Sequence, residues 1–214
     1  MKKGLNTQET MEMIVAACDK IIASKDYLTQ VDSCIGDGDH GIGMSGGMEK
    51  ARTALLAKAP FADINSIFKT TGMAMLNSMG GASGVIFGSM FLSGIKGLET
   101  ITDLNSKTFP LIMSKSLDSI KKRGQAQVGD KTMVDALEPA VIAMQKADTQ
   151  DMAQLMEIAA DAAEHGMEKT KEFVAKFGKS QYLGERSLGH QDAGATSVSI
   201  IFRAMSDYLH NKTE

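Results

Sequence analysis

Apolar side chains recur every three or four residues along most of this chain, and that spacing restricts its fold more than any other feature. One such stripe lies near the start of the chain and another near its end. The first comprises Met11, Ile14, Val15, Cys18, Ile21 and Ile22, and the second comprises Val198, Ile201, Phe202, Met205, Tyr208 and Leu209. This period places the apolar residues on one face of an α-helix. No segment alternates convincingly between apolar and polar residues, as a half-buried strand would, so we predict an all-α fold.

Capping residues and helix breakers divide the chain into about eight predicted helices. Besides the two striped segments, we expect helices at about Met44–Lys58, after a cap at Asp63, after a cap at Ser83, at about Thr108–Arg123 with Gly124 as its C-terminal glycine, from a cap at Asp130 to Met144, and at about Asp151–Phe177. Residues 98–107 and 179–194 are predicted as loops. No linker, internal repeat or low-complexity tract interrupts the chain, so residues 1–214 are expected to form one domain.

Composition and charge exclude several classes of protein. Lys and Arg number 23 against 26 Asp and Glu, and the net charge of -3 leaves no excess of positive charge to neutralise nucleic-acid phosphates. With only two cysteines, Cys18 and Cys34, the chain is no disulfide scaffold. No apolar signal segment follows the first lysines, and polar residues and Gly80-Gly81 interrupt the uncharged residues 70–95. We therefore expect a cytoplasmic protein without a membrane span.

Four segments are rich in glycine and small polar residues, and amphipathic packing does not account for them. They are Asp32–Gly47, Gly80–Gly84, Gly124–Met133 and Leu183–Thr196. Each adjoins a predicted helix terminus. Helix N-termini bind anions through their free N–H groups and the positive end of the helix dipole. Any one segment alone is better interpreted as a tight turn, but four of them in one domain indicate a shared phosphate-binding site.

Three carboxylates, Asp32, Asp37 and Asp39, lie within eight positions of the first segment. Like charges this close repel one another unless a cation joins them, and carboxylate oxygens favour Mg²⁺ or Ca²⁺. The EF-hand calcium pattern fails in both registers that we tested, whereas Mg²⁺ that enters with a phosphate ligand needs only one or two protein carboxylates. The alternative interpretation is a capping aspartate beside an Asp-Gly turn.

Two glycine patterns are not interpreted as nucleotide-binding motifs. The range Gly36–Gly46 holds two overlapping matches to G-x-G-x-x-G, but no strand is predicted before them, and the aspartates would repel a bare pyrophosphate. Gly178-Lys179-Ser180 resembles the end of a P-loop, yet Phe173 occupies the position of the required earlier glycine.

Lys131 is left with two interpretations: it reaches a phosphate, or it lies exposed at a helix start.

Four motifs occur in order along nearly the whole chain. They are Asp32-x4-Asp37-x-Asp39-His40-Gly41, Gly80-Gly81-Ala82-Ser83-Gly84, Gly129-Asp130-Lys131-Thr132-Met133-x-Asp135, and Tyr182-Leu183-Gly184-Glu185-Arg186-Ser187-x-Gly189-His190-x-Asp192. Together they closely resemble the motifs of the nucleotide-binding L subunits of dihydroxyacetone kinases. The resemblance implies an up-and-down barrel of eight antiparallel helices, with nucleotide bound in the loops at one end. The number of helices agrees with the count from periodicity.

The same resemblance implies roles for particular residues. Asp32, Asp37 and Asp39 would hold two Mg²⁺ ions. His40, Gly41, Ile42 and Gly43 would line the phosphate end, Ala82 and Ser83 would donate to phosphate, Gly124 and Met133 would bound the adenine, and Arg186 with Asp192, Ala193 and Gly194 would close over the nucleotide. The chain has Ala193 where the family usually has proline and Val85 where it often does, which loosens two turns but removes no ligand.

For function, the resemblance implies an ADP- or ATP-binding kinase subunit that is half an enzyme. The nucleotide would transfer its γ-phosphoryl group to dihydroxyacetone held on a separate K subunit. A phosphohistidine M subunit of the phosphotransferase system would then rephosphorylate the bound ADP. Two alternatives stay open: an ATP-dependent kinase subunit for another small keto-sugar such as erythrulose, and a regulatory nucleotide-binding module. No nucleic-acid or membrane partner is expected.

Overall fold

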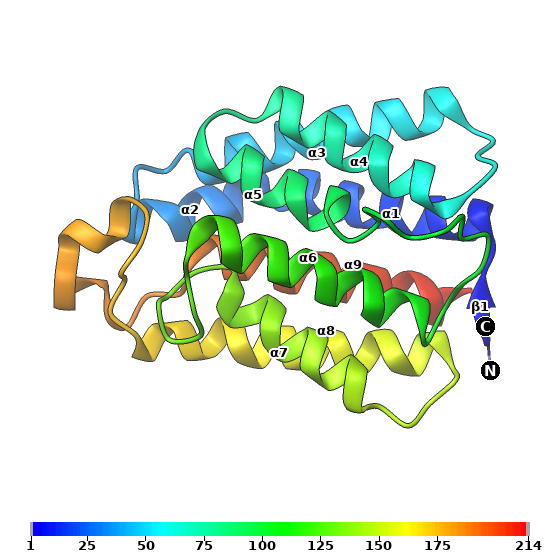
Figure 1. Ribbon diagram of the computed structural model, residues 1–214. Coiled ribbons are helices and arrows are strands. Elements are labelled where there is room, and N and C mark those ends of the chain that lie inside the picture. Colours follow the sequence, from blue (N-terminus) through cyan, green and yellow to red (C-terminus); the bar gives the residue numbers. More distant parts are fainter. Residues whose placement is uncertain (1, 213–214) are drawn as a thin grey trace.

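The computed structural model describes residues 2–212, and its helices run back and forth along one axis (Figure 1). Within this range there are nine α-helices, two 3₁₀ segments and two strands of two residues each. The helices are α1 (Thr7–Ala23), α2 (Lys25–Ile35), α3 (His40–Lys58), α4 (Ile64–Ser78), α5 (Gly81–Leu92), α6 (Thr108–Gly124), α7 (Val134–Lys146), α8 (Met152–Lys169) and α9 (Ala193–Asn211). The 3₁₀ segments are η1 (Thr170–Glu172) and η2 (Lys179–Ser187), and the paired antiparallel strands are β1 (Gly4–Leu5) and β2 (Leu104–Asn105).

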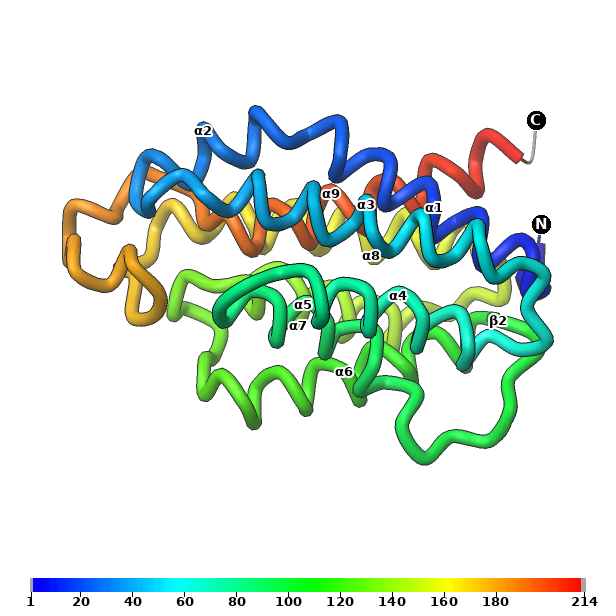
Figure 2. Tube along the Cα trace, turned by 90° about the horizontal axis from the view of Figure 1, so that it is seen from above, coloured from blue at the N-terminus to red at the C-terminus, as the bar shows by residue number. Residues whose placement is uncertain are grey.

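Eight of these helices form a closed ring. Helix α1 packs against α3, each helix from α3 to α8 packs against the next one in the chain, and α9 packs against α1. Neighbouring helices of the ring run in opposite directions (Figures 1 and 2). The expected up-and-down barrel of eight antiparallel helices is confirmed. Helix α2 lies outside the series, at one end of the ring, where it contacts α3, α9 and η2.

Large apolar side chains fill the interior of the ring. Phe68 and Phe91 are buried with their ring centroids 6.1 Å apart, and Phe109 and Phe202 are buried with theirs 6.5 Å apart. Many methionines occupy the remaining core positions, where their flexible side chains fill irregular gaps. The middle of the barrel is therefore packed like an ordinary protein core.

The predicted cap at Asp63 is confirmed, and several predicted boundaries were wrong. The side chains of Asp63 and Asp151 cap α4 and α8 by accepting from the amides of residues 66 and 153. Asp130, however, caps no helix, because its carboxylate accepts from the Gln127 amide inside the loop. Helix α8 ends at Lys169, eight residues before the predicted end at 177, and gives way to η1.

The sequence analysis also missed α2 and placed the start of α3 too late. Only three residues of α2 are buried, Leu28, Val31 and Ile35, so its apolar stripe is short. Helix α3 begins at His40, four residues before the predicted Met44, because its glycines do not prevent helix formation. The glycine-rich segment Asp32–Gly47 therefore consists of the end of α2, a turn of four residues, 36–39, and the first part of α3.

The alternating direction of the helices decides where the connections lie. Residues 36–39, 79–80, 125–133 and 170–192 all join helices at one end of the barrel, on the left in Figure 1. The strand pair and the connections 59–63, 93–107 and 147–151 lie at the other end.

Candidate functional site

The four glycine-rich segments singled out from the sequence meet at one end of the barrel. The Nε2 atom of His40, at the start of α3, lies 2.8 Å from the Oγ atom of Ser197 on α9. The His40 ring lies 5.9 Å, between centroids, from the ring of Phe87 on α5. A Cβ atom placed on Gly194 of α9 would lie 3.3 Å from the Cβ atom of Met133, just before α7. The start of α3 thus contacts α5 and α9, and the start of α9 lies close to the residue that precedes α7.

Asp32, Asp37 and Asp39 form a cluster of carboxylates at this end. Asp32 lies in the last turn of α2, Asp37 lies in the turn, and Asp39 is the N-cap residue of α3. One oxygen from each of them lies within 4.8 Å of the others. The turn brings them together because Gly38 adopts a φ of 76°, a conformation that residues with a side chain rarely adopt.

The cluster fits a divalent cation better than the alternative interpretation of a simple capped turn. The side chain of Asp39 makes no capping hydrogen bond to α3. The Asp32 carboxylate accepts one long hydrogen bond, 3.2 Å, from the His40 amide. Asp37 and Asp39 remain 44% and 72% exposed, so solvent or phosphate oxygens can reach the same ion. Carboxylate oxygens beside open coordination positions suit Mg²⁺, which in phosphate-binding sites takes one or two protein carboxylates together with phosphate oxygens and waters.

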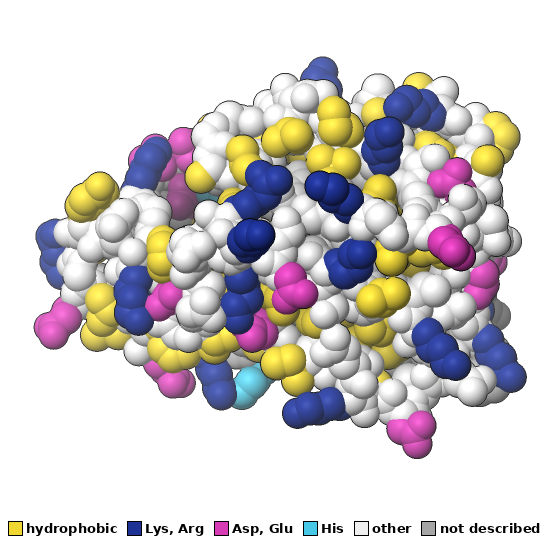
Figure 3. All heavy atoms as spheres, viewed as in Figure 1, with side chains coloured by type: hydrophobic (Ala, Val, Ile, Leu, Met, Phe, Trp, Pro, Cys, Tyr) yellow, Lys and Arg dark blue, Asp and Glu magenta, His cyan; other side chains and the backbone are white. Residues whose placement is uncertain are grey.

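A lysine that the sequence analysis did not assign to the site lies against this cluster. The Nζ atom of Lys179 contacts the Asp37 carboxylate and lies 3.5 Å from Oδ2 of Asp39. Lys179 begins η2 directly after Gly178, whose φ is 66°. Acidic and basic side chains lie together at this end of the molecule in Figure 3. The structure thus places Lys179 of the segment 178–180 at the carboxylate cluster, although this segment is no P-loop.

His40 and Gly41 are fixed by packing against other elements. Burial lowers the pKa of His40, against the opposing effect of the Asp32 carboxylate, and so favours the neutral ring. Gly41 is buried where a Cβ atom would overlap the backbone carbonyl of Lys25 and the side chain of Thr29. A side chain at residue 41 would therefore require α2 to move away from α3.

Ile42 and Gly43 complete the first turn of α3 and remain accessible. The Ile42 side chain is 58% exposed, and a Cβ atom on Gly43 would meet open space. Both residues are therefore free to line a ligand, as the resemblance implies.

Helix α5 begins with free backbone N–H groups. Its N-cap residue is Gly80, without a side-chain cap, and Gly81 follows with a φ of 66°. The predicted cap at Ser83 was wrong, since Ala82 and Ser83 both lie inside the first turn and are exposed. Uncapped N–H groups at a helix N-terminus bind anions. This correction strengthens the interpretation of residues 82–83 as phosphate donors.

The loop between α6 and α7 places Gly124 and Met133. Gly124 is the last residue of α6, and the left-handed residue after it is Gln125, so the prediction that Gly124 lies just past the helix was wrong by one position. A Cβ atom on Gly124 would lie 3.8 Å from the side chain of Ile86 on α5. Met133 is 5% exposed and precedes the first residue of α7. Both residues therefore border the same end of the barrel.

Asp192, Ala193 and Gly194 form the start of α9. Asp192 caps this helix, and its Oδ2 atom accepts from the Ala195 amide at 2.7 Å. Burial raises the pKa of Asp192 to about 7, with a further contribution from the Asp135 carboxylate that outweighs the nearby Lys131 ammonium.

Arg186 lies exposed in η2. Among the residues that the structure describes, Lys179 and not Arg186 is the cation that pairs with the carboxylate cluster.

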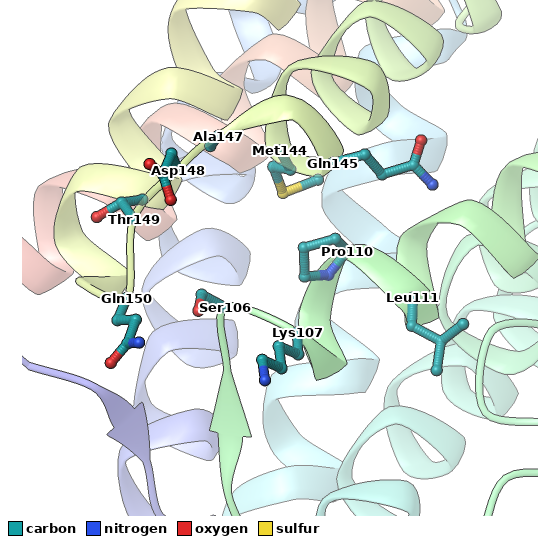
Figure 4. Close-up of a pocket in the computed structure, with 10 residues that line it drawn as sticks. All are labelled: Ser106, Lys107, Pro110, Leu111, Met144, Gln145, Ala147, Asp148, Thr149 and Gln150. Carbon is teal, nitrogen blue, oxygen red and sulfur yellow. The ribbon is translucent and has the colours of Figure 1, made fainter.

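A groove lies at the opposite end of the barrel. It measures about 840 Å³ and lies between the start of α6 and the connection from α7 to α8 (Figure 4). Lys107 and Pro110 line one side, and Asp148 and Thr149 line the other. None of the predicted site residues borders this groove.

None of the helices in the described part of the chain combines the length and the hydropathy that a membrane span requires.

Comparison with known proteins gives consistent matches over most of the chain. The sequence profile of the DAK2 domain matches residues 34–207. The ADP-binding subunit DhaL of PEP-dependent dihydroxyacetone kinase 1 from Listeria innocua is 38% identical over 187 residues, which cover 87% of this chain and 89% of that protein. The ADP-binding subunit DhaL of the PEP-dependent dihydroxyacetone kinase from Escherichia coli is 35% identical over 205 residues, which cover 95% of this chain and 97% of that protein.

The fold also matches a solved structure. The dihydroxyacetone kinase of C. freundii, solved in complex with AMP-PNP and Mg²⁺, superimposes with a TM-score of 0.71 at 22% sequence identity. The match covers 95% of this chain but only 34% of that chain. At this identity the likeness bears on the fold alone.

Proposed function

The chain belongs to the DAK2 domain family, and from this premise we propose that it is the ADP- or ATP-carrying L subunit of a dihydroxyacetone kinase. The observation that carries the proposal is that three carboxylates, with oxygens within 4.8 Å of one another, lie at the same barrel end as the uncapped start of α5. In this proposal residues 1–214 act as a single nucleotide-binding domain in the cytoplasm.

We assign Asp32, Asp37 and Asp39 as the ligands of two Mg²⁺ ions. When bound, such ions offset the negative charge of the nucleotide phosphates, which is the main requirement of phosphoryl transfer. Lys179 adds a further positive charge beside the same carboxylates. The half-exposed carboxylates support this assignment because the phosphates and the ions must share one coordination sphere.

The remaining candidate residues enclose the nucleotide. Phosphate oxygens accept from the N–H groups at Ala82 and Ser83 and lie along His40, Gly41, Ile42 and Gly43. Gly124 and Met133 bound the adenine, while Arg186 and the segment Asp192, Ala193 and Gly194 close over the nucleotide. The support for this arrangement is that all of these residues lie at the connections of one barrel end.

A partner subunit must supply the other half of the reaction. Asp192 caps α9, Asp135 accepts from two backbone amides, and the three clustered carboxylates serve as metal ligands, so we assign the activation of the sugar hydroxyl to a K-type subunit. The γ-phosphoryl group leaves the nucleotide for a hydroxyl oxygen of dihydroxyacetone bound on that subunit. ADP stays on this chain, and the phosphohistidine of an M-type subunit returns a phosphoryl group to it.

Reconstitution with separate partners tests this function. The full chain is mixed with purified K-type and M-type subunits and dihydroxyacetone, and phosphosugar is measured with either the phosphohistidine donor or ATP. Turnover driven by the phosphohistidine donor supports the proposal. Turnover with free ATP and the K-type subunit alone, or with erythrulose in place of dihydroxyacetone, would favour the keto-sugar kinase. Nucleotide binding without any transfer would make the chain a regulatory module.

A further inference from the structure

The proposed chemistry leaves one buried lysine unused. Lys131 is 1% exposed and is the one charged residue among the largest fully buried side chains of residues 2–212. Its Nζ atom donates to the backbone carbonyl of Thr170 at 2.6 Å and to that of His190. The interpretation of Lys131 as an exposed lysine at a helix start was therefore wrong, and two backbone carbonyls hold its ammonium.

The two carbonyls belong to different parts of the chain. Thr170 directly follows α8, and His190 lies two residues before the cap of α9. Lys131 itself lies in the loop before α7, two residues from Met133. One ammonium thus joins the start of α7 to both ends of the long connection 170–192.

Thr170 extends this link to the start of α9. Its side chain is fully buried, and its Oγ1 atom accepts from the amide of Asp192 at 2.9 Å and donates to the carbonyl of Met167 at 2.6 Å. The same residue therefore receives Lys131 on its carbonyl and Asp192 on its hydroxyl. The two segments assigned to the nucleotide, Met133 and residues 192–194, are connected through two side chains.

The loop around Lys131 is held in the conformation that this link needs. Lys131 has a φ of 62°, a left-handed conformation that is unfavourable for a residue with a side chain. The Asp135 carboxylate accepts from the amides of Gly129 and Thr132 at 2.6 and 2.7 Å. Asp130 accepts from the Lys176 amide through its carbonyl, and its carboxylate lies 2.8 Å from the Lys176 ammonium. Contacts with other residues, rather than the intrinsic conformational preference of Lys131, thus fix the backbone of this loop.

We propose that Lys131 is a positioning residue that holds the starts of α7 and α9 in the relative arrangement a single nucleotide requires. Burying an ammonium is unfavourable unless hydrogen bonds compensate it, so the two carbonyls must remain in place as long as Lys131 is buried. The proposal rests on the proposed function, because it assigns Met133 and residues 192–194 to one ligand.

The variant Lys131→Met tests the proposal, because it keeps a long apolar side chain and removes the donor. We expect ADP affinity, measured by calorimetry on nucleotide-free full-length protein with Mg²⁺, to fall roughly ten- to hundredfold. Amide hydrogen exchange at Asp192 and Ala195 should accelerate, while exchange in α1 and α4 stays at the wild-type rate. Lys107→Met, at an exposed lysine of the opposite end, serves as the control and should change neither quantity.

Two results would overturn the proposal. One is wild-type ADP affinity in a folded Lys131→Met protein. The other is faster exchange throughout the barrel in proportion to the loss of affinity, which a general structural role would produce. A wild-type chain that binds no ADP would instead contradict the proposed function, so the two failures are distinguishable.

A second pair of variants serves if Lys131→Met does not fold. Thr170→Val removes the hydroxyl that accepts from the Asp192 amide, and Thr170→Ser keeps it. The valine variant should bind ADP more weakly than the serine variant, with faster exchange at Asp192. Equal affinity in the two variants would overturn the proposal.

Discussion

At the scale of single residues, the carboxylates at the two ends of the barrel have different surroundings. Three carboxylates face one another at the loop end, with Lys179 as the one nearby cation that pairs with them in the described chain. At the other end, Glu12 of α1 accepts from Tyr208 of α9 at 2.6 Å and from Lys212. The first group is poised to bind a ligand, whereas the second ties the first helix to the last.

Asp37→Ala should abolish phosphoryl transfer without unfolding the protein. The substitution removes a proposed metal ligand, and it also relieves repulsion within the cluster. We expect turnover with partner subunits to fall on the order of a hundredfold or more, while the thermal midpoint stays the same or rises. Asp19→Ala, at a surface aspartate 2.6 Å from Arg52, is the matched control. Wild-type turnover in Asp37→Ala would remove Asp37 from the metal site.

Glu12 should make stability depend on pH below the ordinary range of a carboxyl group. Hydrogen bonds from Lys212, Tyr208 and Gln8 lower the pKa of Glu12 from 4.5 to about 2 in the folded protein. A lowered pKa adds stability that is complete above the unfolded value and is lost as pH falls toward the folded value. Urea unfolding should therefore show that wild type exceeds Glu12→Gln in stability at pH 6, and that the difference shrinks between pH 4.5 and 2. A constant difference over that range would show that the carboxylate does not contribute in this way.

At the scale of elements, close packing depends on particular glycines. A Cβ atom on Gly41 would overlap the backbone of α2, and one on Gly166 of α8 would overlap the Asp135 carbonyl of α7. Other glycines of α3, such as Gly46, face open space. Only glycines such as Gly41 and Gly166, which lie against a neighbouring helix, are required for the helices to approach one another.

Gly41→Ala and Gly46→Ala should change stability in opposite directions. The added methyl at residue 41 must push α2 away from α3, which we expect to destabilise the protein by about 1–3 kcal/mol. The methyl at residue 46 meets nothing and improves helix propensity, which should stabilise it by about 0.5–1 kcal/mol. Urea denaturation of both variants measures the difference. Equal stability of the two would contradict the packing of α2 on α3.

The sequence predicted the elements with long apolar stripes and failed where local signals were weak or misleading. The stripes of α1 and α9 are strong because each helix buries one full face. Helix α2 was missed since only three of its residues are buried. Asp130 looked like a cap, but its carboxylate accepts from the Gln127 amide and pairs with Lys176, 46 positions away. Such long-range contacts leave no local pattern.

In the candidate site, too, some residues could be predicted from the sequence and others could not. The carboxylates at 32, 37 and 39 were predicted because they are close in sequence, and the structure brings their oxygens together. Lys179 reaches Asp37 across 142 positions, so spacing could not identify it. Lys131 was misjudged because a lysine at a helix start is ordinarily exposed. Its burial depends on Thr170 and His190, which come from another part of the fold.

At the scale of the whole molecule, topology creates the site. An up-and-down ring places every second connection at the same end, so glycine-rich segments far apart in sequence meet without any long crossover. The carboxylates of Asp37 and Asp39 are 44% and 72% exposed, so the site is open to solvent. An open site of loops suits a subunit that presents its nucleotide to a partner.

The nucleotide content of the purified protein tests the central claim most directly. The chain is purified in Mg²⁺, passed through gel filtration and extracted with acid, and the released nucleotide is identified by chromatography. We predict that the extract contains about one ADP per chain. Addition of a chelator before gel filtration should release this ADP from the protein, because it removes the ions that join phosphates to carboxylates. An empty protein that binds no nucleotide even with added Mg²⁺ would contradict the account.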